Sequence, residues 1–303
     1  MKIKLSKDYI FPVNILIIFL VIIGAWIYTK ELKVKMQQEI GIVHNQDKTL
    51  LLSSLEENVL PSQGVTLPIV WGDLGVQLIN SGTIDSKKFK VIYESRGQFT
   101  DEYKKLLLDQ NNGKLKITKE NSGYLLNLFW ALGLANKNPI LEKGEMMNPA
   151  YSEAGNFAST GGWTLAKGKH MDYYSRHSLV TLTKEQQTLV DKISRGIYRP
   201  CCGNSTHFPD CNHGMAMLGL LELMASQGVS EQDMWKTALV VNSYWFSDAY
   251  ITIAIYMKNK GIEWKDVNSE EILGINYSST QGYKSVSSQI ILPKQQQGGG
   301  CNI

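Results

Sequence analysis

The pattern of apolar and polar residues divides the chain into an apolar N-terminal run, a polar connecting stretch and a long region of helical periodicity. No charged residue lies between Asp8 and Lys30, and aromatic residues stand at both ends of this run. A helix over residues 9–29 would be about 30 Å long, which matches the hydrocarbon core of a bilayer. We therefore predict a short tail over residues 1–8 followed by a transmembrane anchor over residues 9–29.

The orientation of this anchor rests on weak signals. Three lysines precede the run and three follow it, so the positive-inside rule gives a tie. The short N-terminal tail favours a cytoplasmic tail and an extracytoplasmic globular part. A cleaved signal peptide is the alternative, but the run is long for one and no small-x-small site follows Trp26. The sequence predicts a single-pass membrane protein whose contact with the membrane is residues 9–29.

Helical periodicity dominates the rest of the chain. Residues 30–61 are polar but keep apolar residues at helical spacing, which indicates a stalk or linker. Residues 62–292 predict one mainly α globular domain with long irregular loops and two candidate lobes, 62–180 and 181–292. The predicted helices cover 73–81, 85–93, 100–110, 124–134, 183–196, 213–227, 230–244 and 247–260, the last of them, and one short strand covers 114–118.

Three stretches stand out within this pattern. Residues 124–134 are apolar nearly all round, which predicts a buried helix, and Thr183 to Gln186 fit a capping box. Residues 135–180 have no period, and so long an irregular connection in a compact domain is typically functional. Residues 293–303 are rich in Gly and Gln and predict a flexible tail ending near Cys301.

The charge of the chain excludes one class of partner. The formal net charge is +3. The first 35 residues carry a net charge of +4, which leaves the remainder at −1. Nucleic-acid affinity rests largely on neutralised phosphates, so a globular part without a basic field predicts no nucleic-acid partner.

The strongest chemical signal is a group of thiols and imidazoles in front of a predicted helix. Three of the four cysteines, Cys201, Cys202 and Cys211, and two of the five histidines, His207 and His213, lie within residues 201–213. The free backbone N–H groups and the positive dipole end of that helix favour a thiolate there. Thiolate and imidazole together suit copper, zinc and iron–sulfur species.

The leading hypothesis is a membrane-anchored extracytoplasmic protein that binds a soft or borderline metal, or transfers thiols or electrons, at residues 201–213. Cys201, Cys202 and Cys211 supply three ligands, and His207, His213 or the tail residue Cys301 completes the set. The spacing C-C-x8-C-x-H matches none of the common zinc patterns, so copper, zinc and iron all stay open. A protein that donates or accepts the metal is the expected partner.

Two alternatives use the same residues differently. Four cysteines in an oxidising compartment also fit two disulfides, which would make the domain a binding or scaffold module. Its pocket, beneath residues 150–177, would then receive a peptide or a glycan. In the lesser alternative Cys211 is the nucleophile of an enzyme, with a nearby imidazole as base and helix N–H groups as an oxyanion site. Whether the protein is an enzyme is left open.

Isolated polar residues outside the loop carry weaker signals. Glu222 is the one charged residue between Met215 and Met224, and the favoured interpretation is a narrow polar stripe that reaches the surface. The alternative is a buried acid with a raised pKa. His170 and His177 are expected at the surface unless they form a second wall of the cysteine site together with Tyr173 and Trp163.

Overall fold

The computed structural model describes residues 23, 26–33, 35–36 and 50–290. The chain divides into two compact units, Met1–Ser54 and Leu55–Ile303. Residues 26–33 of the first unit are helical. Within the described residues, every helix falls short of the length or the apolar character required to cross a bilayer. The predicted anchor over 9–29 lies largely outside the described residues, so it stays a prediction.

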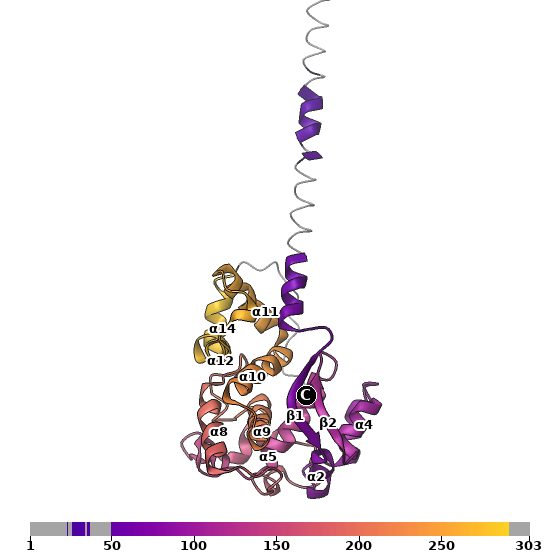
Figure 1. Ribbon diagram of the computed structural model, residues 1–303, viewed down its shortest axis with the longest axis vertical. Helices are drawn as coiled ribbons and strands as arrows, with labels where there is room; N and C mark the ends of the chain where they lie inside the picture. Colours follow the sequence, from indigo (N-terminus) through magenta and orange to yellow (C-terminus); the bar gives the residue numbers. More distant parts are fainter. Residues whose placement is uncertain (1–22, 24–25, 34, 37–49, 291–303) are drawn as a thin grey trace, which may run out of the picture. The chain divides into compact units, whose positions relative to one another are not determined.

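The second unit is mainly helical, as the periodicity predicts (Figure 1). Its principal elements are β1 (Val65–Gly72), α2 (Leu74–Ser81), α3 (Ser86–Glu94), α4 (Asp101–Leu108), β2 (Asn112–Ile117), α5 (Ser122–Ala135), α8 (Lys184–Gly196), α9 (Asn212–Ser226), α10 (Glu231–Trp245) and α11 (Ser247–Asn259). All eight predicted helices are confirmed. The capping box is also present, since Thr183 accepts from the Gln186 N–H and the Gln186 side chain accepts from the Thr183 N–H.

The centre of the unit is the crossing of α5 and α9, which are apolar on almost every side and nearly fully buried. Gly133 of α5 and Gly219 of α9 let the two backbones touch. A Cβ at Gly133 would lie 2.1 Å from the Met215 carbonyl oxygen, and a Cβ at Gly219 would lie 2.5 Å from the Phe129 carbonyl oxygen. The core therefore depends on the absence of side chains at these two positions.

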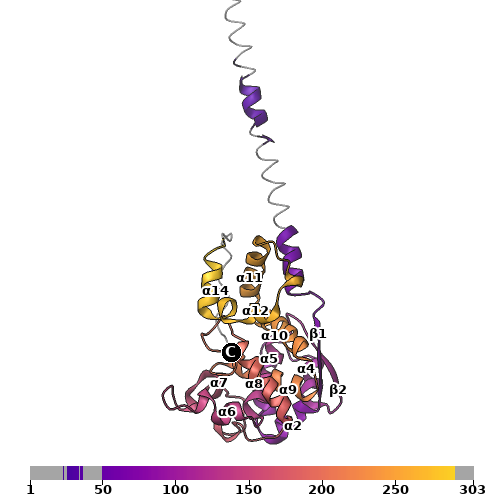
Figure 2. The ribbon, with the colours of Figure 1, turned by 60° about the vertical axis from the view of Figure 1, so that its left-hand side comes forward.

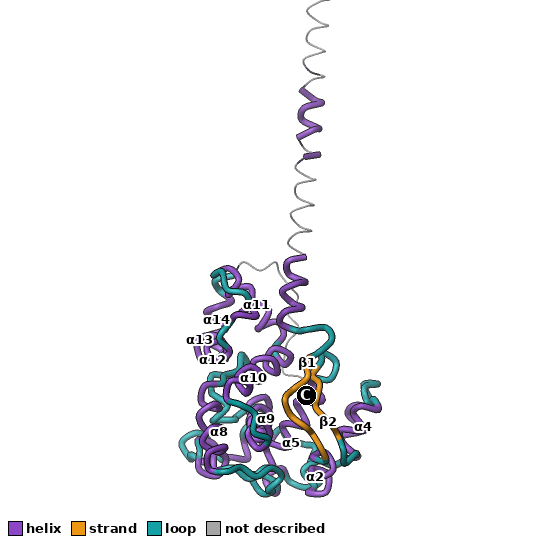
Figure 3. The backbone as a smooth tube through the Cα atoms, viewed as in Figure 1, coloured by secondary structure: helices purple, strands orange, loops and turns teal. Residues whose placement is uncertain are grey.

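A two-stranded antiparallel sheet lies on one side of this core, and Figure 3 shows it as the orange pair. The sequence predicts β2 but not β1. In β1 the residues Leu67, Ile69 and Trp71 alternate inward, and Trp71 donates its indole N–H to the Leu106 carbonyl. The partner strand begins 40 residues after β1 ends, so the pairing is not local and β1 was missed.

The prediction that residues 247–260 form the last helix is wrong. Three short helices follow, α12 (Ser269–Leu273), α13 (Ile275–Ser278) and α14 (Thr280–Ser287). Side chains of Asn268 and Ser279 cap α12 and α14, and α14 packs against α11 (Figure 2). Their polar sequence hides the short buried stripe of Ile272 and Leu273, which is too brief to show a helical period.

The irregular connection predicted over residues 135–180 is present. It holds only short helical turns, among them α6 (Pro139–Lys143), η2 (Glu145–Met147) and α7 (Ala158–Gly161). Indole donors tie it to the core, because Trp130 donates to the Ser159 carbonyl and Trp163 donates to the Thr83 carbonyl. The connection is thus a packed part of the fold.

Candidate metal centre

The loop between α8 and α9 carries the predicted cysteines, and backbone hydrogen bonds hold it from several directions. Tyr198 donates its N–H to the Leu273 carbonyl, and Thr280 donates its N–H to the Cys202 carbonyl at 3.0 Å. The Asn242 side chain donates to the Tyr198 carbonyl. The C-terminal helices that the sequence missed therefore form the support of this loop.

The sulfur atoms of Cys201, Cys202 and Cys211 form an equilateral triangle. All three Sγ–Sγ distances are 3.8 Å. Two thiolates bound to one tetrahedral zinc ion at about 2.3 Å are separated by about 3.8 Å. The spacing exceeds a disulfide bond of about 2.05 Å, and all three cysteines are free. In a four-iron cluster each cysteine binds a different iron atom, so the triangle fits a single ion.

His213 stands beside this triangle in the first turn of α9. One imidazole nitrogen and the sulfurs of Cys201 and Cys211 lie within 4.8 Å of one another. The ring packs against Phe246 and Trp245, with centroids 4.4 and 5.8 Å away. Its Nδ1 atom is buried and has no hydrogen-bond partner among the described residues. The described structure thus contains a Cys/His group close enough to bind a metal ion.

Arg199 supplies the positive charge of the site. Its side chain is fully buried and donates from Nη2 to Asp210 Oδ1 at 2.9 Å. Nε and Nη1 have no partner within the described part of the chain. The guanidinium lies against Gly214, where a Cβ would be 2.8 Å from Cζ. A buried guanidinium with two unused donors requires nearby negative charge, which the Cys211 thiolate and the Asp210 carboxylate supply.

The electrostatics make Cys211 the first thiolate of the group. Hydrogen bonds from the Cys201 and Cys202 thiols hold the pKa of Cys211 well below its usual range, and the Arg199 guanidinium acts in the same direction. Cys211 is also the N-cap of α9, where its sulfur accepts from the Gly214 N–H at 3.4 Å. The same thiol contacts raise the pKa of Cys201. The N-terminus of α9 and the Arg199 guanidinium therefore stabilise Cys211 as a thiolate.

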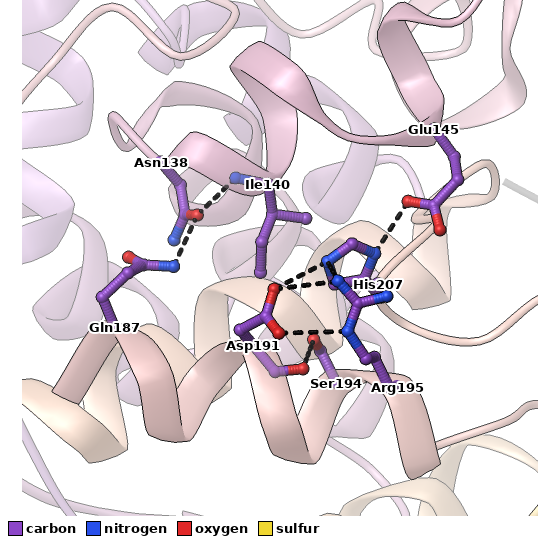
Figure 4. Close-up of polar contacts among 8 residues, drawn as sticks. All are labelled: Asn138, Ile140, Glu145, Gln187, Asp191, Ser194, Arg195 and His207. Atoms are coloured by element: carbon purple, nitrogen blue, oxygen red, sulfur yellow. Dashed lines mark hydrogen bonds and ion pairs between the residues drawn. The ribbon is translucent and has the colours of Figure 1, made fainter. Parts of the chain in front are cut away.

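One predicted ligand, His207, is not part of this group. His207 is buried, but its Nδ1 lies 2.7 Å from Glu145 Oε2 and its Nε2 lies 2.9 Å from Asp191 Oδ1 (Figure 4). Both ring nitrogens are therefore engaged by side chains other than the cysteines, and Arg195 Nη2 also lies 2.8 Å from Nε2. Cys301 lies outside the described residues. Among the described residues, the structure thus brings Cys201, Cys202 and Cys211 together, with His213 next to Cys201 and Cys211.

Other predictions near the site have mixed outcomes. Sequence reasoning missed Arg199, although its position directly before Pro200 and the cysteine pair was an available signal. His170 contacts the Gly155 carbonyl oxygen at 3.2 Å, and the ring of His177 stacks on Tyr173. These partners give neither histidine a contact with the sulfurs. The described contacts therefore do not support a second wall of the cysteine site formed by these two histidines.

The favoured interpretation of Glu222 is wrong, because this carboxyl is fully buried. Its two oxygens accept from the side-chain amides of Asn136 and Asn138, which come from the irregular connection. Burial raises the pKa of Glu222 to about 8. A polar stripe was expected on α9, but the irregular connection covers that face and supplies amide donors instead.

Comparisons with protein-family models, with curated proteins and with solved structures find no match to this chain. The geometry of the donor atoms is therefore the basis for a functional assignment.

Proposed function

We propose that this protein holds one divalent metal ion, best fitted by zinc, on Cys201, Cys202, Cys211 and His213. The observation that carries the proposal is the set of three equal Sγ–Sγ distances of 3.8 Å. Three thiolates and one imidazole form a complete tetrahedral donor set, as in structural zinc sites. Such an ion would tie the loop after α8 to the first turn of α9.

The charge of the site favours a divalent ion over monovalent copper. Three thiolates and Asp210 carry four negative charges, and Arg199 offsets one of them. A divalent ion leaves a net charge of about −1, whereas a monovalent ion leaves about −2 in a partly buried place. Because uncompensated buried charge is unfavourable, the divalent ion is the better fit.

Thiol–disulfide exchange is a second candidate, and the exposure of Cys201 favours it. An exposed thiol 3.8 Å from the sulfur of Cys211 needs only a small movement to form a disulfide. The two candidates differ in what a purified sample contains. A metal site holds a stoichiometric ion and four free thiols, whereas an oxidised Cys201–Cys211 pair holds no ion and leaves two free thiols.

The test is elemental analysis of the full-length chain purified under reducing conditions, together with a thiol count after denaturation with a chelator. We expect one zinc ion and four titratable thiols per chain. Cys202→Ser should lose the ion, while Ser205→Ala, a matched change in the same loop, should keep it. Cobalt substitution should give the visible absorption of a tetrahedral thiolate centre. A sample without a stoichiometric ion would exclude the metal site.

We also propose that residues 9–29 attach the protein to a membrane with the second unit on the extracytoplasmic side. The uncharged run between Asp8 and Lys30 supports this proposal. A metal-donating or metal-accepting protein on that side would be its partner. Membrane flotation of the full chain and of a variant lacking residues 1–30 tests the attachment, and equal flotation of both would contradict it.

A further inference from the structure

A cavity of about 630 Å³ lies between α6, the segment 178–183 and one face of α8. A second hollow of about 410 Å³ shares Lys143, Gly144, Arg195 and His207 with it. Cavities of this size are typical of sites for metabolite-sized ligands. The lining includes none of the four proposed metal ligands, so this place is separate from the metal centre.

One buried carboxyl organises both walls of the cavity. Glu222 accepts hydrogen bonds from the side-chain amides of Asn136 and Asn138. The side-chain oxygen Oδ1 of Asn136 in turn accepts from the backbone N–H groups of Leu179 and Val180 at 3.1 and 3.0 Å. This contact fixes the wall formed by residues 178–182. The side-chain oxygen Oδ1 of Asn138 accepts from the side-chain amide of Gln187 in α8 at 3.1 Å (Figure 4). Fully buried support behind the lining is the mark of a preorganised site.

A closed set of charges forms one end of the cavity. His207 lies between Glu145 and Asp191, and Asp191 also accepts from Arg195 at 3.0 and 3.1 Å (Figure 4). The Arg195 guanidinium pairs with the Asp191 carboxylate, and its Nη2 atom also lies 2.8 Å from His207 Nε2. The negative charge of Asp191 is therefore neutralised inside the lining.

The remaining charge of the lining is positive. Lys137, Lys143 and Lys184 line the cavity, and none of them is among the ion pairs of the described residues. The one guanidinium of the lining, Arg195, is already paired with Asp191, so it is not available for a bidentate phosphate contact. Apolar surface from Ile140 and neighbouring residues completes the lining.

We propose that this cavity binds a small organic acid. Its carboxylate groups pair with the lysines at the rim, and its carbon skeleton lies against Ile140, Val180 and Leu182. Ammonium groups are point charges that suit carboxylates, and the apolar wall requires a ligand with carbon surface. Glu222 has no contact with the ligand and acts as a positioning residue through Asn136 and Asn138.

The test is calorimetric titration of the full-length, metal-loaded chain with succinate at low salt. Succinate is chosen over a chelating tricarboxylate so that the metal centre keeps its ion. We expect saturable binding with one site per chain. The double variant Lys143→Gln and Lys184→Gln should weaken binding about tenfold or more, since two charge-assisted contacts are lost. Lys87→Gln, which changes an exposed lysine of α3, is the matched control and should bind like the unaltered chain.

Two further arms separate ligand classes. Inorganic phosphate and sucrose should each bind more weakly than succinate, and equal or tighter binding of either would overturn the assignment to an organic acid. Glu222→Ala should weaken succinate binding while metal content stays at one ion per chain, because both asparagine amides then lose their acceptor. Absence of saturable succinate binding, or equal affinity in the double lysine variant and the control, would also overturn the proposal.

Discussion

Two polar clusters lie along the same buried helix and differ in whether their polar atoms have hydrogen-bond partners. At the first turn of α9, the Nε and Nη1 atoms of Arg199 and the Nδ1 atom of His213 have no partner among the described residues. In the middle of α9, Glu222 accepts two amide hydrogens, and both amides also serve backbone or side-chain partners. The described structure leaves the first cluster incomplete and closes the second.

This difference separates two roles for buried polar groups. Buried polar atoms in native proteins almost always have partners, so the unpartnered imidazole nitrogen of His213 beside three sulfurs marks a place that a metal ion would complete, and the Arg199 donors face the negative charge of the same site. The hydrogen-bonded network of Glu222 needs no ligand, and it fixes the positions of Asn136 and Asn138. We infer that the end of α9 binds an ion and that its middle shapes a neighbouring cavity.

The largest effect is expected from the two histidines of the cysteine stretch. His213→Ala removes a ligand, so metal affinity should fall at least a hundredfold, whereas His207→Ala should leave one ion per chain. Chelation should lower the free energy of unfolding of the unaltered chain by about 5 kcal/mol or more. Competition with a chromophoric chelator and urea unfolding measure these effects. Retention of the ion by His213→Ala would remove this residue from the ligand set.

Arg199 provides the next test of the incomplete cluster. Arg199→Met keeps the volume but leaves Asp210 and the thiolates without a positive neighbour, so the free energy of unfolding should fall by about 3–5 kcal/mol. Zinc affinity should fall at least tenfold. Arg195→Met, which removes an exposed guanidinium paired with Asp191, is the control and should leave zinc affinity unchanged. Equal zinc affinity in the Arg199 variant would show that the thiolates do not need this charge.

The buried Glu222 carboxyl should make the free energy of unfolding depend on pH. The pKa of Glu222 rises from its ordinary value of 4.5 to about 8 in the folded chain. The folded state therefore keeps a proton that the unfolded state releases, and stability should fall as pH rises between these values. From pH 5.5 to 7.5 the loss is about 2–3 kcal/mol.

Glu222→Gln should remove this dependence. Urea unfolding of a metal-free Cys202→Ser background, with and without the Glu222 change, isolates the contribution because metal-linked protons are then absent. Parallel pH profiles of the two variants would contradict the assignment of the raised pKa to Glu222.

The smallest effect concerns the packing that carries both clusters. Gly219→Ala places a Cβ against the α5 backbone and should lower the free energy of unfolding by about 1–3 kcal/mol. A Cβ at Gly203, inside the cysteine loop, meets no atom within 4 Å. Gly203→Ala should therefore change the free energy of unfolding by less than about 0.5 kcal/mol. Thermal unfolding compares the pair, and a neutral Gly219→Ala would show that α5 and α9 separate at little cost.

The sequence by itself determined the principal helices and the grouping of the three cysteines. Caps and apolar periodicity are local, so all eight predicted helices are present. Cys201, Cys202, Cys211 and His213 lie within one short loop and helix turn, so their proximity in the chain became proximity in space.

Only the tertiary structure decided which way each side chain faces and what meets it. His207 belongs to the same stretch, yet its N–H bonds the Ser194 carbonyl and its ring meets Asp191 and Glu145. The partners of Glu222 lie 84 and 86 residues away in a segment without a period. Contacts between distant segments depend on packing and loop closure, which no local pattern encodes.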